Sequence, residues 1–486
     1  MSGPSAGQIP DLLKIGAVPV NTAMDVETSV LDPVIQNDRF IRFTLQNKGI
    51  LHSHSKIQFA LSNASSQAYL HPNVGIAGLF QRATLKVGNT TICEIDDFAH
   101  FTAYRSLFMS NETSRERLQY QTGQMMSKEW MYLDEGDLSG STANGGGQSS
   151  TEAVDIGVSN GLEYDVSQTT PQTTVSQVQM PNYLHLSKSD SHSCPTFQWS
   201  LSDFFPFLKV NQLPLYMMRE QINLEFVLSE AGSASVQTQR AFIDADTGAS
   251  DLTYSLDTTK TKMFADYIYY PQEMMISYQQ ANPRLDFSYV DYRLSKLHVA
   301  GTETGTQIRN LGGAGLLVSK VMWGIATKDG SPEDSVLGDY NATAVDKTYT
   351  SPPAFGDTIG TATMNVKYND RFLYPIDVDN NARHFHNVVQ AEGLVPFVSR
   401  EEYSNEGVNL PQRKLVGYAQ DASLRGKFFW CASQLNRAER INSRGVELYF
   451  QYASPPTQAN GYDLRAYVEH IKTATLEQGY LTCYNA

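Results

Sequence analysis

The stretch FQWSLSDFFPFLKVNQLPLYMMREQINLEFVL, residues 197–228, places a cluster of aromatic residues between two strand patterns. Residues 197–201 and 222–228 both carry large apolar side chains at every second position, which is typical of a strand that buries one face. Between them, Ser202 or Asp203 is expected to cap one helical turn that ends near Phe207. The stretch therefore predicts a strand, a short aromatic plug, a loop and a second strand.

Composition narrows the class of protein. The chain has 486 residues, which favours two domains over a single core. Charged residues make up 18% of it, below the roughly 25% usual for soluble proteins, as expected if much of the surface contacts partners. The net charge is −14 and no run of basic residues occurs, so we expect neither binding of bare nucleic acid by phosphate neutralisation nor direct sequence-specific nucleic-acid binding.

Cysteine usage and the absence of targeting patterns indicate assembly in a cytosol-like space. The four cysteines form no CxxC pair, which predicts buried free thiols and neither a zinc site nor a disulfide framework. The first residues lack a signal-peptide layout, and no apolar stretch is long enough to be a transmembrane segment. We therefore expect no N-glycosylation at the sequons of Asn63, Asn89, Asn111 and Asn341.

Further strand and helix patterns fill both halves of the chain. Alternation predicts strands at 39–45, 56–61, 83–87, 264–270, 287–290, 294–299 and 316–325. A helix preceded by Asp96 or Asp97 is expected to bury Phe98, Phe101, Tyr104 and Phe108. A second helix is expected to begin at Pro271 and to end before Pro283.

Three long polar segments and an N-terminal arm interrupt this pattern. Residues 134–176, 229–262 and 328–361 are rich in small and polar residues, and we expect them to form surface loops. Residues 1–25 are predicted to be an arm that is too polar to form a core alone.

Two alignments of the chain with itself indicate a duplicated unit. Residues 79–98 match residues 384–403 in the spacing of aromatic, glycine and acidic positions. The alternating residues Ile222, Leu224 and Phe226 match Val446, Leu448 and Phe450. We predict an all-β protein of two consecutive eight-stranded Greek-key sandwiches, or jelly rolls, with a few short helices and long surface loops.

Several passages resemble one family. They are FTLQNKGILHSHSKIQFAL (43–61), LFQRATLKVG with the following IDDFAHFTAYRSL, the stretch quoted first, ADYIYYPQEMMISYQQ (265–280) and AYVEHIKTATLEQGYLTCYN (466–485). Together they are similar to the double jelly-roll major capsid proteins of polinton-like viruses and virophages, and more distantly to those of nucleocytoplasmic large DNA viruses. At 475–479 this chain has TLEQG where relatives often carry a glycine-rich turn.

The resemblance implies a fold, a function and partners. It implies an arm at 1–25, a first jelly roll with a linking helix at 26–281 and a second jelly roll at 282–486. It further implies a homotrimer that builds an icosahedral shell around a double-stranded DNA genome. The implied partners are neighbouring capsomers, penton proteins and minor capsid proteins, and the implied location is the virion, assembled in the host cytoplasm or nucleus. The aromatic plug would seal one end of a barrel.

Candidate chemical sites are few, and each has a simpler structural interpretation. His52 with His54, and His384 with His386, have the spacing of two ligands on one strand face, yet no cysteine or carboxylate cluster accompanies them. Asp377 and Asp379 lack the spacing of a calcium loop. We predict neither catalytic nor cofactor-binding nor metal-binding residues. Residues 200–202 (SLS) and 312–315 (GGAG) do not match a nucleophile elbow or a phosphate loop, and GGAG is predicted to be a turn.

The alternative function is a two-domain β-sandwich carbohydrate-binding protein or glycosidase. Such a protein would present exposed tryptophan platforms or paired carboxylates. Trp130, Trp199, Trp323 and Trp430 all lie in apolar contexts that predict core positions. The capsid interpretation is therefore preferred.

Overall fold

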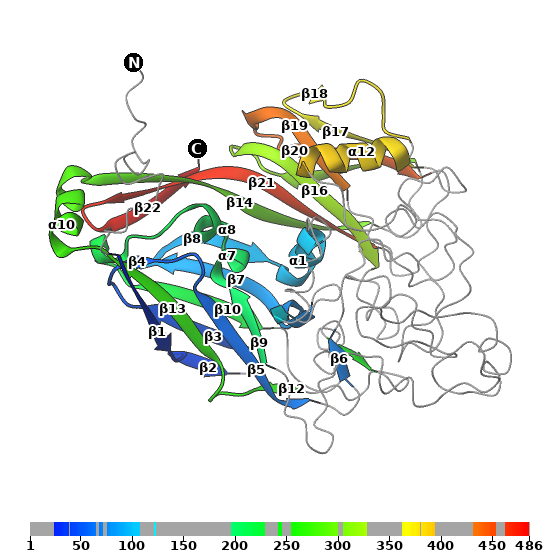
Figure 1. Ribbon diagram of the computed structural model, residues 1–486. Helices are drawn as coiled ribbons and strands as arrows, with labels where there is room; N and C mark the ends of the chain where they lie inside the picture. The colour runs from blue at the N-terminus through cyan, green and yellow to red at the C-terminus, as the bar shows by residue number, and fades with distance from the viewer. Residues whose placement is uncertain are drawn as a thin grey trace, which may run out of the picture.

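The computed structural model describes residues 24–37, 39–64, 68–70, 75–106, 121–122, 196–228, 242–244, 254–299, 305–327, 362–379, 381–393, 431–452 and 462–485. Antiparallel strands dominate them (Figure 1).

Eight strands of the first half form a sandwich of two sheets. In chain order they are β1 (Asp25–Leu31), β3 (Phe40–Leu45), β5 (Lys56–Ala64), β7 (Phe80–Val87), β8 (Thr90–Asp96), β9 (Thr196–Ser200), β10 (Ile222–Leu228) and β13 (Lys262–Tyr269). One sheet has the order β1-β13-β5-β9 and the other β3-β10-β7-β8. Counted along the chain, strands 1, 8, 3 and 6 share one sheet, and strands 2, 7, 4 and 5 share the other.

The second half repeats this order strand for strand. Its strands are β14 (Arg284–Val299), β15 (Gly305–Gly312), β16 (Leu317–Thr327), β17 (Ala362–Tyr368), β18 (Arg371–Phe372), β19 (Cys431–Arg440), β20 (Val446–Tyr452) and β21 (Tyr462–Glu477). The sheets are β14-β21-β16-β19 and β15-β20-β17-β18. Both halves therefore have jelly-roll topology, and the predicted fold class is confirmed.

Short strands and helices complete the two sandwiches. The additional strands are β2 (Ile35–Asn37), β4 (Ile50–Leu51), β6 (Ala68–Leu70), β11 (Phe242–Asp244), β12 (Tyr254–Leu256) and β22 (Tyr480–Asn485). The helices are α1 (Phe98–Ser106), η1 (Gly75–Leu79), α7 (Leu201–Phe204), α8 (Pro206–Val210), η2 (Leu215–Met217), α10 (Gln272–Ala281) and α12 (Asn381–Glu392). Helix α10 lies between the two sandwiches in the chain, and the domain limits at residues 25 and 281 stay a prediction.

The aromatic plug contains two short helices where one helical turn was expected. Helix α7 begins after Ser200 and ends at Phe204, and α8 begins at Pro206. Proline has no N–H to continue the first helix, but its fixed φ suits the first position of the second. Phe204, Phe205 and Phe207 are all fully buried.

Two further sequence expectations need correction, and one strand was not predicted. Residues 287–290 and 294–299 belong to one continuous strand, because β14 pairs with β21 along its whole length. Strand β15 was missed, since glycine and polar residues dominate it. The segment 229–262 is not only loop, because β11, β12 and the start of β13 lie in it. The other two predicted loops, at 134–176 and 328–361, lie outside the described residues.

One of the two internal alignments is wrong and the other is confirmed. Residues 80–87 form strand β7, whereas the matched residues around 385–392 form helix α12. The matched glycines have unrelated roles, since Gly88 begins a hairpin turn and Gly393 ends a helix, both with positive φ. Strands β10 and β20, in contrast, occupy the same position in the two jelly rolls.

The short turns of each jelly roll gather at one end. In the first roll, the turn after β7 bonds the segment before β10, through Gly88 N–H to the carbonyl of Gln221 at 2.9 Å. In the second roll, the turn after β15 bonds the turn after β19, through Gly315 N–H to the carbonyl of Ile441 at 2.9 Å. The longest insertions, 97–195, 229–261, 328–361 and 373–430, connect strand ends on the opposite side of the sandwiches.

Candidate functional site at the junction of the two jelly rolls

Two long strands carry a sheet of the second jelly roll over the first. Strands β14 and β21 pair from Arg284 opposite Glu477 to Val299 opposite Tyr462. Strand β21 pairs on its other edge first with β16 and then, from Lys472 onward, with β22. Strands β14 and β22 contact β8 of the first roll, and β14 also contacts α8 (Figure 1). The junction is therefore built from strands and not from a flexible linker.

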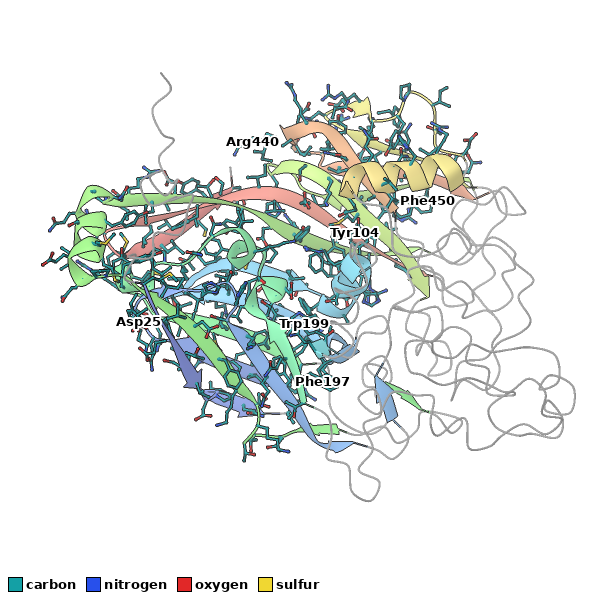
Figure 2. The ribbon with its side chains drawn as sticks, viewed as in Figure 1. Asp25, Tyr104, Phe197, Trp199, Arg440 and Phe450 are labelled. Carbon is teal, nitrogen blue, oxygen red and sulfur yellow. The ribbon has the colours of Figure 1, made fainter. Side chains whose placement is uncertain are left out.

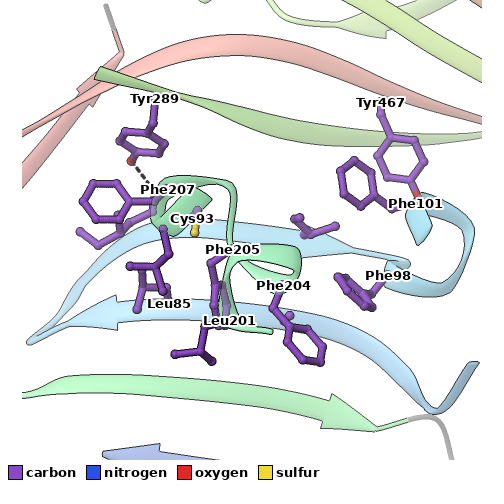
Figure 3. Packing of buried hydrophobic residues seen from close by; sticks show 14 of the residues in the cluster. Leu85, Cys93, Phe98, Phe101, Leu201, Phe204, Phe205, Phe207, Tyr289 and Tyr467 are labelled. Carbon is purple, nitrogen blue, oxygen red and sulfur yellow. Dashed lines mark hydrogen bonds between the residues drawn. The ribbon is translucent and has the colours of Figure 1, made fainter. Parts of the chain in front are cut away.

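The aromatic plug joins the two cores. Phe204 packs inside the first roll, with its ring 4.9 Å from that of Phe226. Phe207 packs on β14, with its ring 5.8 Å from that of Phe287 and 4.9 Å from that of Tyr289 (Figure 3). One continuous cluster of buried apolar side chains includes residues of both rolls. The plug thus connects the rolls in addition to filling the first one.

A bulge in β8 supplies an acceptor for the second roll. Ile92 lies between the residues of β8 that pair with β7, so it is left out of that ladder. The Tyr289 hydroxyl donates to the Ile92 carbonyl at 2.6 Å, and Lys472 Nζ donates to it at 3.2 Å. Lys472 also pairs with Asp291 at 2.7 Å. A buried carbonyl without a partner is costly, so this bulge and the second roll stabilise each other.

Two cysteines lie beside this contact. The Tyr289 hydroxyl is 3.5 Å from the sulfur of Cys483, while Cys93 is fully buried in β8. Burial raises the pKa of both thiols, most strongly that of Cys93. Both thiols are free, as predicted, but only Cys93 is fully buried, whereas Cys483 is half-buried. Cys194 and the side chain of Cys431 lie outside the described residues.

A buried ion pair forms a second contact, where α1 meets β21. Asp97, with φ of 51°, immediately precedes α1. One carboxylate oxygen is 2.8 Å from Nε of Arg465, and the other is 2.6 Å from Nδ1 of His100. The Tyr467 hydroxyl donates to the Asp97 carbonyl at 2.9 Å. Burial, together with the Asp97 charge, raises the pKa of Tyr467 well above its usual value. Arg465 is only 1% exposed and Asp97 is 23% exposed, so the pair is partly shielded from water and salt.

A third polar contact joins α12, β16 and α1. Lys320 Nζ lies 2.8 Å from Glu392 and 3.2 Å from Glu469, and all three side chains are at most 13% exposed. The hydroxyl of the buried Tyr104 donates to Glu392. Helix α1 of the first roll is thereby held by α12 of the second, and Lys320 of β16 bridges α12 to Glu469 of β21.

The turn between β21 and β22 closes the junction at its end. Gln478 and Gly479 have φ of 54° and 89°, so this is a two-residue hairpin turn with both central residues in the left-handed region. Arg219 N–H of the first roll donates to the Gly479 carbonyl at 2.9 Å. Glu220 accepts from the N–H of Leu481 at 3.3 Å. The TLEQG segment therefore ends in a hairpin turn that binds the first jelly roll.

The two histidine pairs differ from what their spacing predicts. His52 and His54 lie in a turn and not on a strand face, although their rings are 4.4 Å apart. The backbone N–H of His54 donates to Nδ1 of His52 at 3.0 Å. This hydrogen bond occupies one of the ring nitrogens that could bind a metal. Burial lowers the pKa of His52. His384 and His386 lie in helix α12 and not on a strand.

The remaining candidate residues from the sequence have structural roles. Asp377 accepts from Asn365 Nδ2 at 2.7 Å, and Asp379 pairs with Arg383 at 3.2 Å. The glycines of GGAG form the turn between β15 and β16, as predicted, with positive φ at 312, 313 and 315. Ser200 and Ser202 bond each other at 2.8 Å. Trp199 and Trp323 are buried, as expected, and Trp130 and Trp430 lie outside the described residues.

The described part of the chain has neither a helix suited to span a membrane nor a side-chain cluster suited to hold a metal ion. None of its helices has the length and apolar character to cross a membrane. None of its histidine, cysteine, aspartate and glutamate side chains form a group of three or more suited to a metal ion.

Sequence reasoning did not find the junction. In residues 464–468, Leu464, Ala466 and Val468 alternate with Arg465 and Tyr467, which is typical of a strand with one face in water. Both faces are in fact buried, because the second face covers the first jelly roll. No local signal identified the junction, because Asp463 and Glu469 lie on the same strand face as Arg465 and offered nearer partners than Asp97.

Comparisons with solved structures place this fold among virus capsid proteins. The chain is similar to the Faustovirus major capsid protein, with a TM-score of 0.53, 12% identity and coverage of 96% of this chain and 94% of that one. It is similar to a chain of the PBCV-1 virus capsid, with a TM-score of 0.51, 11% identity and coverage of 96% and 97%. It is also similar to a chain of the Sputnik virophage, with a TM-score of 0.50, 11% identity and coverage of 100% and 90%. No family model and no curated protein matches the sequence.

Proposed function

We propose that this chain is the major capsid protein of a double-stranded DNA virus of the polinton-like or virophage type. The observation that carries the proposal is the pair of jelly rolls with identical strand order, fused through a buried junction. The Faustovirus structure of the same fold is a major capsid protein, and we propose no catalytic activity for this chain.

The geometry explains how such a chain would tile a shell. Each copy has two similar sandwiches held side by side, so a trimer would present six similar units and a pseudo-hexagonal outline. The junction supports this role because a capsomer needs its six units at fixed angles. Arg465, Tyr289 and Phe207 fix that angle through buried contacts and not through a hinge.

The remaining parts of the proposal follow the sequence. We propose that residues 26–281 and 282–486 form the two jelly rolls, and that residues 1–25 form an arm beneath the shell. The long insertions would lie on the outer face. The partners would be two further copies, neighbouring capsomers, penton proteins and minor capsid proteins. The protein would reside in the virion after assembly in the host cytoplasm or nucleus.

The rival function, carbohydrate binding or glycoside hydrolysis, has less support. Trp199 and Trp323 are 3% and 1% exposed, so neither can serve as a sugar-stacking platform. The capsid proposal requires no such surface.

Measurement of mass and shape tests the proposal. At micromolar concentration, light scattering should give three times the chain mass of 54.0 kDa, since permanent interfaces of this kind bury about 2,000 Å² or more. Negative-stain images should show hexagon-outlined trimers or closed shells. A stable monomer that binds a glycan array would contradict the capsid proposal and support the rival.

A further inference from the structure

The short-turn end of the second jelly roll carries a cluster of cations that is not visible in the sequence. It comprises Lys367, Arg371, Arg437, Arg440 and Arg444, contributed by β17, β18, β19 and the turn after β19. We call this cluster the basic tip. Three carboxylates lie among these residues, those of Asp370, Glu439 and Glu447. The tip is therefore locally positive in a chain whose net charge is −14.

Hydrogen bonds between neighbouring turns make the tip rigid. Asn369 and Asp370 form a two-residue turn with φ of 47° and 63°. Asn369 Oδ1 accepts from Asn442 N–H at 2.8 Å, and its Nδ2 donates to the Arg440 carbonyl at 3.1 Å. Arg440 Nε donates to the Gly315 carbonyl at 3.3 Å. The cationic side chains therefore extend from a fixed backbone, so the backbone loses little conformational entropy when the tip binds a partner.

The arginines project outward while their main carboxylate partner lies beneath them. Glu439 is 13% exposed and pairs with both Arg371 and Arg437, at 2.9 Å from the latter. The two arginine side chains are 51% and 79% exposed. The bond from Arg437 lowers the pKa of Glu439, so this carboxylate remains charged and continues to orient both guanidinium groups. Arg444, 66% exposed, is held by Asp370 at 2.6 Å.

An aromatic pair borders the cations. The rings of Phe372 and Tyr449 are 5.2 Å apart, and Lys367 Nζ lies 5.7 Å and 5.8 Å from their centroids. Phe372 is 51% exposed. Figure 2 shows Arg440 at the end of the second jelly roll that faces away from the strand ends where the long insertions begin.

We infer that the basic tip binds the phosphate backbone of duplex DNA without sequence preference. Oriented guanidinium groups match phosphate oxygens better than ammonium groups do. No base-reading element projects from the tip, because its cations extend from short turns and strand ends. This inference rests on the proposed function, in which the short-turn end faces the enclosed genome while the long insertions face outward.

The test is DNA binding by the purified full chain, measured by fluorescence anisotropy with a labelled 20-base-pair duplex. Binding should weaken steeply with salt, by about 100-fold between 50 and 200 mM for roughly four phosphate contacts. The variant Arg437→Gln/Arg440→Gln should bind more weakly and should reduce the slope of log affinity against log salt by about 2. A duplex of scrambled sequence should bind equally well.

The matched control is Lys56→Gln/Lys260→Gln, which removes the same charge from exposed lysines of the first jelly roll. It should leave the salt slope unchanged. Absence of DNA binding by the unmodified chain at 50 mM salt, or an equal loss in both variants, would overturn the inference. Stronger capture by vesicles of anionic phospholipid, lost in the arginine variant while DNA binding is absent, would overturn it in favour of a membrane surface.

Shell formation distinguishes this inference from the proposed function. Trimers and shells assembled without DNA can be imaged for both variants. If shells form normally while DNA binding is absent, the tip inference is wrong and the capsid proposal stands. If neither trimers nor shells form, the capsid proposal is wrong.

Discussion

At the scale of single residues, Gly479 shows how a turn can be specified from outside its own hairpin. Its φ of 89° already favours glycine, but a second constraint comes from the first jelly roll. A Cβ atom added at this position would lie 2.6 Å from Cγ of Arg219 and 3.1 Å from the carbonyl oxygen of Met217. Glycine is therefore required both by backbone conformation and by close packing across the junction.

We expect Gly479→Ala to lower the free energy of unfolding by about 2–4 kcal/mol. About 1–2 kcal/mol comes from the left-handed backbone, and the rest comes from overpacking against Arg219. Gly315→Ala is the matched control, since Gly315 also has positive φ, 75°, but has open space around its Cβ position. Thermal unfolding should show the smaller loss for Gly315→Ala. Equal losses would mean that the contact with Arg219 contributes nothing.

At the scale of elements, alternation predicted the strands that bury one face and failed for the others. Strands β3, β5, β7 and β10 were found because core-facing residues such as Phe43 and Leu224 recur at every second position. Strand β15 was missed because only Ile308 and Leu311 are large and apolar in it. Helix α12 was aligned to strand β7 because Phe385 and Gly393 repeat the spacing of Phe80 and Gly88, and that spacing does not distinguish a helix from a strand.

The candidate sites were harder to predict for a related reason. Local patterns cannot show which remote elements come together. Asp97 and Arg465 lie 368 positions apart, and the arginines of the basic tip come from separate strands. The sequence contains no run of basic residues that would predict the basic tip. Its cations come together only because the strand order brings separate strands side by side. Both sites depend on strand order, which follows only once the jelly-roll topology is known.

The contact between α1 and β21 should tolerate loss of its arginine poorly. We expect Arg465→Met to lower the free energy of unfolding by about 3 kcal/mol, the lower end for a buried ion pair, because Asp97 loses Arg465 but is 23% exposed and keeps His100. Denaturant titration of the purified chain would measure the loss. Arg444→Met is the control, since Arg444 and Asp370 form an exposed pair that should contribute about 0–1 kcal/mol. A loss for Arg465→Met no larger than the control's would show that the ion pair does not stabilise the junction.

At the scale of the whole molecule, the arm at residues 1–25 lies almost entirely outside the described residues and stays a prediction. Its apolar residues are more numerous than a free tail requires; they are Ile9, Leu12, Leu13, Ile15 and Val18. Ordering such a segment costs about 1–2 kcal/mol per residue, which only burial on a partner can offset. We therefore expect the arm to lie beneath the shell and to order on a neighbouring subunit, an internal membrane or a minor protein.

Deletion of residues 2–20 should separate assembly of trimers from assembly of shells. Trimers should still form, because both jelly rolls are untouched, but closed shells should fail or lose heat resistance. Light scattering and negative-stain images of the truncated and unmodified proteins would provide the comparison. Normal yields of shells with unchanged heat resistance would show that the arm has no role in closure.

The path of β14 and β21 has a consequence for how the subunit is made. The first jelly roll can form its own sheets while the ribosome is still producing later segments, but the surface of β8 and α8 has to wait for the second roll. Strand β21, at residues 462–477, is among the last strands to emerge, and it carries Arg465, Tyr467 and Lys472. A nascent chain that stalls before residue 462 would lack Tyr467, which packs on Phe101, and Lys472, which donates to the Ile92 carbonyl. Such a chain would expose apolar surface to chaperones and proteases, so aborted translation products would tend to be removed before they could join a growing particle.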